Sequence, residues 1–177
     1  ATLNDRVLTF LNRARNVTLD PLSFRDGEAY YQRSFEELDL DIPGDLRLRA
    51  ARATQGSPYM LQLIGYNIGN RCKTGEHVTP EQVDGAIEAS KADFENDVCE
   101  TTLAALSDQD VAFLDAMTDD EDAVSRISDV AKRMSVTPDY AQKYRRRLID
   151  AGVIEQARRG YVRFAVPYMA DYLRSQL

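Results

Sequence analysis

The first hundred residues carry apolar side chains three or four positions apart, which is the spacing of helices that bury one face. Ser23, Ser57 and Thr79 stand where such helices need an N-cap oxygen. Two of these caps are followed by Pro at the first helical position. The helix that Ser57 caps is apolar on most sides, so we expect it at the centre of a helical bundle. The pattern predicts helices over Leu3–Arg15, Ser23–Leu38, Asp45–Thr54, Ser57–Cys72 and Thr79–Ala105.

From Ser107 onward the pattern changes to short helices that are followed by strands. Ser107 caps a helix that ends near Met117, and the acidic loop Asp119 to Asp122 follows it. The later elements are helices at Ser125–Met134 and Thr137–Gly152, strands at Val153–Ala157 and Tyr161–Ala165, and a closing helix at Pro167–Ser175. A helix, a tight turn, a second helix and a β-hairpin are the elements of a winged helix.

These elements predict a mainly α chain with two domains. Residues 1–98 form a helical bundle, and residues 99–177 form a winged helix-turn-helix domain with a small β-hairpin. The boundary lies inside the long helix that Thr79 begins, so we expect a stiff connector between the two domains.

The helix that begins after Thr137 has an inner and an outer face at helical spacing. Ala141, Tyr144, Leu148 and Ala151 form the inner face, so Gln142, Lys143 and Arg146 face outward together with Asp139. A recognition helix presents side chains to the major groove of DNA from such an outer face. The predicted core of the winged domain comprises Val111, Leu114, Ile127, Val130, Tyr144, Leu148, Val162 and Phe164.

Charge is distributed unevenly along the chain. The net charge is −7, which argues against a protein that coats nucleic acid with its whole surface. Between Lys132 and Arg163, however, nine basic and three acidic residues leave a local charge of +6. Salt screens charges beyond about 8–10 Å, so this segment can attract phosphate despite the acidic remainder. The predicted DNA contacts are Gln142, Lys143 and Arg146 on the helix and Arg158 and Arg159 at the wing tip.

Motifs for catalysis and metal binding are missing from the sequence. It contains no GxxxxGK[ST] phosphate loop, and its single His with the isolated Cys72 and Cys99 does not make a zinc site. We therefore predict no catalytic residue and no metal ligand. No apolar run approaches the ~20 residues that span a bilayer, and isolated cysteines are typical of a reducing compartment. A cytoplasmic protein without a membrane partner is expected.

Three stretches resemble the P-loop ATPases of the AAA+/STAND type. Thr54 to Gly65 reads T-Q-G-S-P-Y-M-L-Q-L-I-G and is similar to the T-x-G-x-P-x-x-x-Q stretch of their helical lid. Leu19 to Ser23, L-D-P-L-S, resembles the L-x-P-L-S junction between the ATPase core and that lid. Tyr144 to Ile154, followed by Arg159-Gly160 and Phe164 to Pro167, resembles the winged helix after the lid in bacterial and archaeal members. Origin-recognition-type initiator ATPases share this layout.

The resemblance implies a C-terminal fragment in which residues 1–22 are the tail end of the ATPase core and the phosphate loop lies upstream of Ala1. The fragment would hold no cofactor and catalyse nothing, whereas the full-length parent would use ATP or ADP with Mg²⁺. Gly56 and Pro58 match the turn that packs beside the adenine in the family. Many relatives also place an Arg at the start of this lid helix to sense the γ-phosphate, but Tyr59 stands there in this chain.

Several functional hypotheses remain open at this stage. In the first, the winged helix binds duplex DNA and the lid docks on the upstream ATPase core of the same chain. In the second, the winged helix is a protein-interaction or autoinhibitory module, because winged helices also bind proteins. A free-standing transcriptional regulator would explain the wing but leaves the lid motif unexplained. The arginines near the end of the predicted recognition helix are also compatible with ordinary solvated charges at a negative helix terminus.

Overall fold

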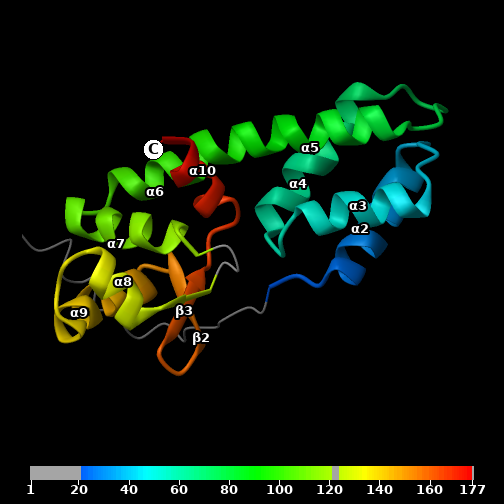
Figure 1. Ribbon diagram of the computed structural model, residues 1–177. Coiled ribbons are helices and arrows are strands. Elements are labelled where there is room, and N and C mark those ends of the chain that lie inside the picture. The colour runs from blue at the N-terminus through cyan, green and yellow to red at the C-terminus, as the bar shows by residue number, and fades with distance from the viewer. Residues whose placement is uncertain (1–20, 121–123, 177) are drawn as a thin grey trace, which may run out of the picture.

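The computed structural model describes residues 21–120 and 124–176. The helix predicted at Leu3–Arg15 lies outside the described residues. The first half contains helices α2 (Phe24–Glu37), α3 (Gly44–Ala53), α4 (Pro58–Arg71) and α5 (Pro80–Phe94) (Figure 1).

The helices of the first half begin at the predicted caps. The side chains of Ser23, Ser57 and Thr79 each accept a hydrogen bond from a backbone N–H in the first turn that follows. Satisfying these otherwise unpaired donors stabilises a helix by about 1 kcal/mol at each cap. Helix α4 buries Met60, Leu61, Ile64 and Ile68 and packs against α5. Its opposite side carries the exposed Tyr66, so α4 is buried on one side rather than on most sides.

A long helical run leads from the first half into the second (Figure 1). Helix α5 continues without a break into a π-helix, η1 (Glu95–Glu100), and then into α6 (Thr101–Ala104). The run matches the predicted helix from Thr79 to Ala105 in extent. The π segment was not predicted, because its wider turn depends on packing rather than on a sequence pattern.

The second half has the predicted winged helix-turn-helix arrangement. Its elements are α7 (Asp108–Thr118), β1 (Val124–Arg126), α8 (Ile127–Arg133), α9 (Pro138–Asp150), β2 (Ile154–Arg158), β3 (Tyr161–Phe164) and α10 (Met169–Gln176). The strands form an antiparallel sheet in the order β1-β3-β2. The mainly α fold with a small sheet near the C-terminus is therefore confirmed.

The start of the helix predicted at Ser125 is wrong. Residues Val124–Arg126 form strand β1, and Ser125 pairs with Val162 of β3, so the helix begins only at Ile127. The Ser125 side chain is buried and donates to the carbonyl of Met117. A strand of three residues is too short to show the alternation that identifies strands in a sequence.

The predicted core is correct for six of its eight residues. Leu114, Ile127, Val130, Tyr144, Leu148 and Val162 are buried, whereas Val111 and Phe164 are only half-buried. In α7 the larger Phe113 and Met117, four residues apart, are fully buried and set the inner face. Ala151, predicted on the inner face of α9, is exposed because it is the residue that caps the end of that helix.

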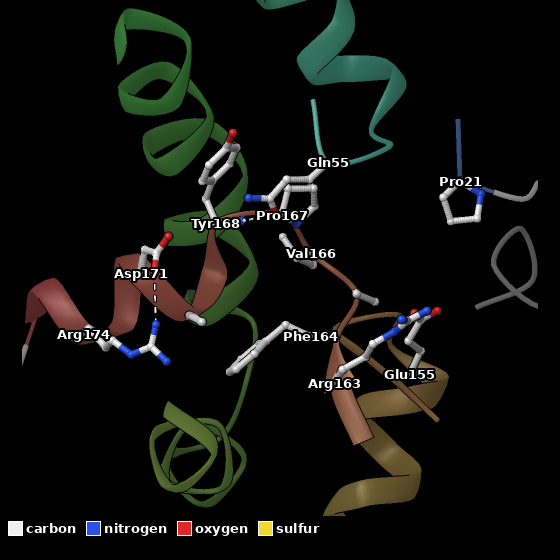
Figure 2. Close-up of a pocket in the computed structure, with 12 residues that line it drawn as sticks. Pro21, Gln55, Glu155, Arg163, Phe164, Val166, Pro167, Tyr168, Asp171 and Arg174 are labelled. Atoms are coloured by element: carbon white, nitrogen blue, oxygen red, sulfur yellow. Dashed lines mark hydrogen bonds and ion pairs between the residues drawn. The ribbon is translucent and has the colours of Figure 1, made fainter. Parts of the chain in front are cut away.

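Tyr168, just before α10, packs the winged half against the first half. Its hydroxyl donates to the carbonyl of Ala53, and its backbone N–H donates to the side chain of Gln55 at 3.4 Å. Its ring meets the edge of Phe94 and lies 5.2 Å from the ammonium of Lys91. The two halves are thus joined by direct contacts as well as by the helical run (Figures 1 and 2).

Candidate nucleic-acid interface

Helix α9 has the two faces that the sequence predicted. The Thr137 side chain accepts a hydrogen bond from the backbone of Tyr140, and Pro138 occupies the first helical position. Ala141, Tyr144 and Leu148 are buried against the rest of the domain. As a consequence the three predicted contact residues on this helix, Gln142, Lys143 and Arg146, are exposed.

Strands β2 and β3 form the wing, and its tip carries Arg158 and Arg159. The ladder shifts register between Gln156 and Arg158, which marks a bulge that increases the local twist. Gly160 turns the chain with a φ of +78°, a conformation that costs Gly little. The Arg158 guanidinium stacks 4.0 Å from the ring centre of Tyr161, and Arg158 and Arg159 are both exposed. This stacking holds the Arg158 side chain at the tip.

Four basic residues of the segment 132–163 are tied to acidic side chains. Lys132 pairs with Asp129, Arg133 with Asp119 and Asp120, Arg147 with Asp110, and Arg163 with Glu155. These pairs neutralise much of the local charge that the sequence showed. They also place Asp119 and Asp120 beside Arg133, whose hydrogen bond lowers the pKa of Asp120. The remaining residues of the acidic loop lie outside the described residues.

The three consecutive arginines of α9 have three different surroundings. Arg147 binds Asp110 at 2.7 Å, and that aspartate is 1% exposed and also completes the cap of α7. Arg145 donates to the side chain of Gln156 in the wing at 2.6 Å. Within residues 21–120 and 124–176, the Arg146 side chain makes neither an ion pair nor a hydrogen bond. Sequence spacing could separate the faces of α9, but it could not identify these partners.

Within the segment 132–163, the basic side chains without an acidic or amide partner are those of Lys143, Arg146, Arg158 and Arg159. They come from α9 and from the wing, the two elements that a winged helix brings to DNA. Lys143 lies 5.9 Å from the ring centre of Tyr144, which leaves its charge at the surface. The structure thus exposes all five predicted contact residues, counting Gln142, and their binding to DNA stays a prediction.

A cavity of about 520 Å³ lies between the wing and the first half (Figure 2). Phe164, Val166 and Pro167 provide its apolar wall, and Gln55 and Pro21 border it on the side of the first half. The charged groups at its rim are paired, Arg163 with Glu155 and Arg174 with Asp171. Because these charges neutralise each other, the cavity offers no concentration of one charge for a nucleotide or another ion.

Gly56 and Pro58, the predicted neighbours of adenine, lie in the turn between α3 and α4. Gly56 has a φ of +80°, and its carbonyl accepts a hydrogen bond from the backbone of Leu22 at 3.0 Å. A Cβ on Gly56 would lie 2.9 Å from the Cβ of Pro21. This close approach accounts for glycine without any ligand. Pro58 is exposed at the start of α4, where its fixed φ suits the first helical turn.

Tyr59 lies in the first turn of α4, directly after Pro58. Its hydroxyl donates to Asp97 of the π-helix at 3.0 Å, and its ring contacts Phe94. In this chain the side chain therefore links α4 to the long helical run. Arg52, which precedes the Thr54 to Gly65 stretch, stacks its guanidinium over the ring of Phe24.

The described residues provide neither a metal site nor a membrane span. Among them, no group of three or more His, Cys, Asp or Glu side chains is arranged to hold a metal ion. None of the helices in residues 21–120 and 124–176 is long and apolar enough to cross a membrane.

Comparison with known proteins gives a family profile and several similar structures. A profile described as "Domain of unknown function (DUF8462)" matches residues 96–173. No curated protein matches the chain. The chain is similar to the solved structure of the Thermotoga maritima RuvB Holliday junction branch migration motor, with 17% identity and a TM-score of 0.42 over 85% of this chain and 49% of that one. A point variant of the same protein gives 16% identity and a TM-score of 0.41 over 85% and 48%. The chain spans about half the length of these structures.

Proposed function

We propose that the winged half binds duplex DNA through α9 and the wing. The observation that carries the proposal is a set of four exposed cations, Lys143, Arg146, Arg158 and Arg159, which make no ion pair within residues 21–120 and 124–176. The other basic side chains of the segment are engaged with partners of the same domain. A cation without an internal partner can neutralise a phosphate without first breaking a protein contact.

The two elements would have different roles. The exposed face of α9 would lie along the major groove, where Lys143 and Arg146 would contact phosphates and the amide of Gln142 could contact a base edge. Arg158 and Arg159 would lie at the wing tip against phosphates or the minor groove. Most of the affinity would come from phosphate contacts, and it would therefore depend strongly on salt.

The direct test is a salt titration of the whole chain with a fluorescently labelled random duplex, followed by anisotropy. Four neutralised phosphates predict a log–log salt slope of about −3.6, because each contributes ~0.9. Affinity should then fall ~150-fold between 50 and 200 mM salt. Absence of binding at up to ~100 micromolar protein, the weak end for non-specific complexes, would overturn the proposal.

The resemblance of the first half to an ATPase lid supports a second part of the proposal. This chain would be one portion of a cytoplasmic P-loop ATPase, and Gly56 and Pro58 would contact the adenine of the nucleotide bound to the upstream core. ATP or ADP with Mg²⁺ would then be the cofactor of the parent, and the present sequence alone would not hydrolyse ATP. ATPase turnover that scales with this purified polypeptide would refute that expectation.

A protein-docking function is the second candidate, and the contacts of Tyr168 favour it. That residue already joins the winged half to the turn of the lid motif through Ala53 and Gln55. The same domain could therefore dock on, or restrain, the rest of the parent. The salt titration with a random duplex distinguishes the two candidates. A docking surface requires a specific acidic protein partner and would show no affinity for the duplex.

A further inference from the structure

We propose that Arg145 is a positioning residue that fixes the wing against α9 and does not itself contact DNA. The inference rests on the proposed function, because it concerns how that same surface is held in shape. It gives each residue of the Arg145-Arg146-Arg147 run a separate role. Arg146 would contact a DNA phosphate, and Arg147 binds Asp110. Arg145 holds the wing through its hydrogen bond to Gln156, a contact that we call the brace.

The strongest evidence is the bond between Arg145 and the wing. A guanidinium nitrogen of Arg145 donates to the side-chain oxygen of Gln156 at 2.6 Å. Guanidinium groups only donate hydrogen bonds, so the oxygen of the glutamine amide must face the arginine. Hydrogen bonds with a charged donor are shorter and about twice as strong as neutral ones. The contact therefore joins α9 directly to β2.

The sheet register explains why Gln156 can be reached from the helix. Gln156 lies opposite Val162, whose side chain is buried, so both are on the side of the sheet that faces the helices. The neighbouring pair Glu155 and Arg163 lies on the other side, beside the cavity of Figure 2. Gln156 is also the last regularly paired residue before the bulge that leads to Arg158. A bond at this position fixes the strand where the wing tip begins.

The rest of the Arg145 side chain agrees with this role. A second guanidinium nitrogen lies 3.5 Å from the side-chain oxygen of Gln142, one of the predicted contact residues. The Nε atom is buried and has no hydrogen-bond partner in the described chain. Arg145 is half-buried overall, whereas its neighbours Arg146 and Arg147 are exposed. The guanidinium thus joins the helix to the exposed Gln156 of the wing, with its Nε atom buried between them.

Loss of the bond between Arg145 and Gln156 should affect DNA binding differently from loss of a phosphate contact. Arg145→Ala should free the wing and weaken binding about threefold to tenfold, the range expected when one or a few groups must be ordered again on binding. The salt slope should stay unchanged, because no phosphate contact is lost. Gln156→Ala should have the same effect, and the double variant should be no weaker than either single variant.

Arg146→Ala is the matched control, because it removes an adjacent arginine that has no partner within the described residues. This variant should reduce the magnitude of the salt slope by about one unit. Arg145→Lys adds a second control: it keeps the charge but loses the planar fork, so it should weaken binding as Arg145→Ala does. A slope that falls by about one unit in Arg145→Ala, with full affinity in Arg145→Lys, would make Arg145 a phosphate contact and overturn the brace.

A measurement without DNA separates this inference from the proposed function. Amide hydrogen exchange at residues 157–160 of the whole chain should accelerate in Arg145→Ala and Gln156→Ala and remain unchanged in Arg146→Ala. Unchanged exchange in all three variants would overturn the brace even if the wild type binds DNA. Faster exchange in the first two, without DNA binding by the wild type, would retain the brace and reject the DNA proposal.

Discussion

Gly56 offers a sharp test of how the turn between α3 and α4 packs against Pro21 and Leu22. Gly56→Ala adds a Cβ at a φ of +80°, 2.9 Å from the Cβ of Pro21 and 3.3 Å from the carbonyl oxygen of Leu22. The left-handed conformation costs a non-glycine residue ~1–2 kcal/mol. Because a proline ring and a backbone carbonyl cannot rotate away, we add an overpacking cost of ~1–3 kcal/mol. The expected loss of stability is therefore ~2–5 kcal/mol.

Gly152 provides a matched control within the same chain. It has a φ of +70°, but a Cβ there would meet nothing within 4 Å, so Gly152→Ala should cost only the ~1–2 kcal/mol backbone term. Urea denaturation followed by circular dichroism measures both values on the intact chain. We expect Gly56→Ala to lower the stability by at least ~1 kcal/mol more than Gly152→Ala does. Equal losses in the two variants would show that Gly56 does not pack against Pro21 and Leu22.

Three further variants test packing, the contact between the halves and pH dependence. Leu148→Ala removes a fully buried side chain and should cost ~2–5 kcal/mol in denaturation, whereas the exposed Asp150→Ala should change stability by less than ~0.5 kcal/mol. Tyr168→Phe deletes the hydroxyl that binds the Ala53 carbonyl and should cost ~1 kcal/mol, and an unchanged denaturation midpoint would refute that contact. Asp120→Asn should cost up to ~1 kcal/mol at pH 7. The hydrogen bond from Arg133 lowers the folded-state pKa of Asp120, so its contribution is present above the ordinary value near 4 and is lost as the pH falls below it. A stability difference between wild type and Asp120→Asn that does not shrink as the pH is lowered from 7 into the acid range would contradict this assignment.

Most of the helices could be predicted from the sequence because their ends carry local signals. Ser23, Ser57, Thr79 and Ser107 act as the expected caps, and each signal lies within a few residues of the helix that it begins. Strand β1 was missed because it is defined by its partner β3, almost forty residues later in the chain. The π-helix was missed for a related reason, since its geometry depends on the surrounding packing.

The candidate interface was predictable in its position but not in its internal pairing. Helical spacing and the turn at Gly160 were enough to predict that the five proposed contact residues are exposed on α9 and at the wing tip. The pairing of Arg147 with Asp110 joins residues 37 positions apart, and only the packing of α7 on α9 brings them together. The contact of Arg145 with Gln156 likewise depends on the register of β2 and β3. Charge counted along the sequence therefore overestimates the number of cations that are available to DNA.

If the unpaired cations of the wing bind DNA, two double variants should differ in their salt slopes. The Arg158→Ala/Arg159→Ala double variant should reduce the magnitude of the slope by about two units for a random duplex. The control double variant, Lys132→Ala/Arg163→Ala, also removes two positive charges, but these side chains form ion pairs with acidic residues of the protein. Its salt slope should therefore match that of the wild type. Equal slopes in the two double variants, or no binding by the wild type at low salt, would contradict the account.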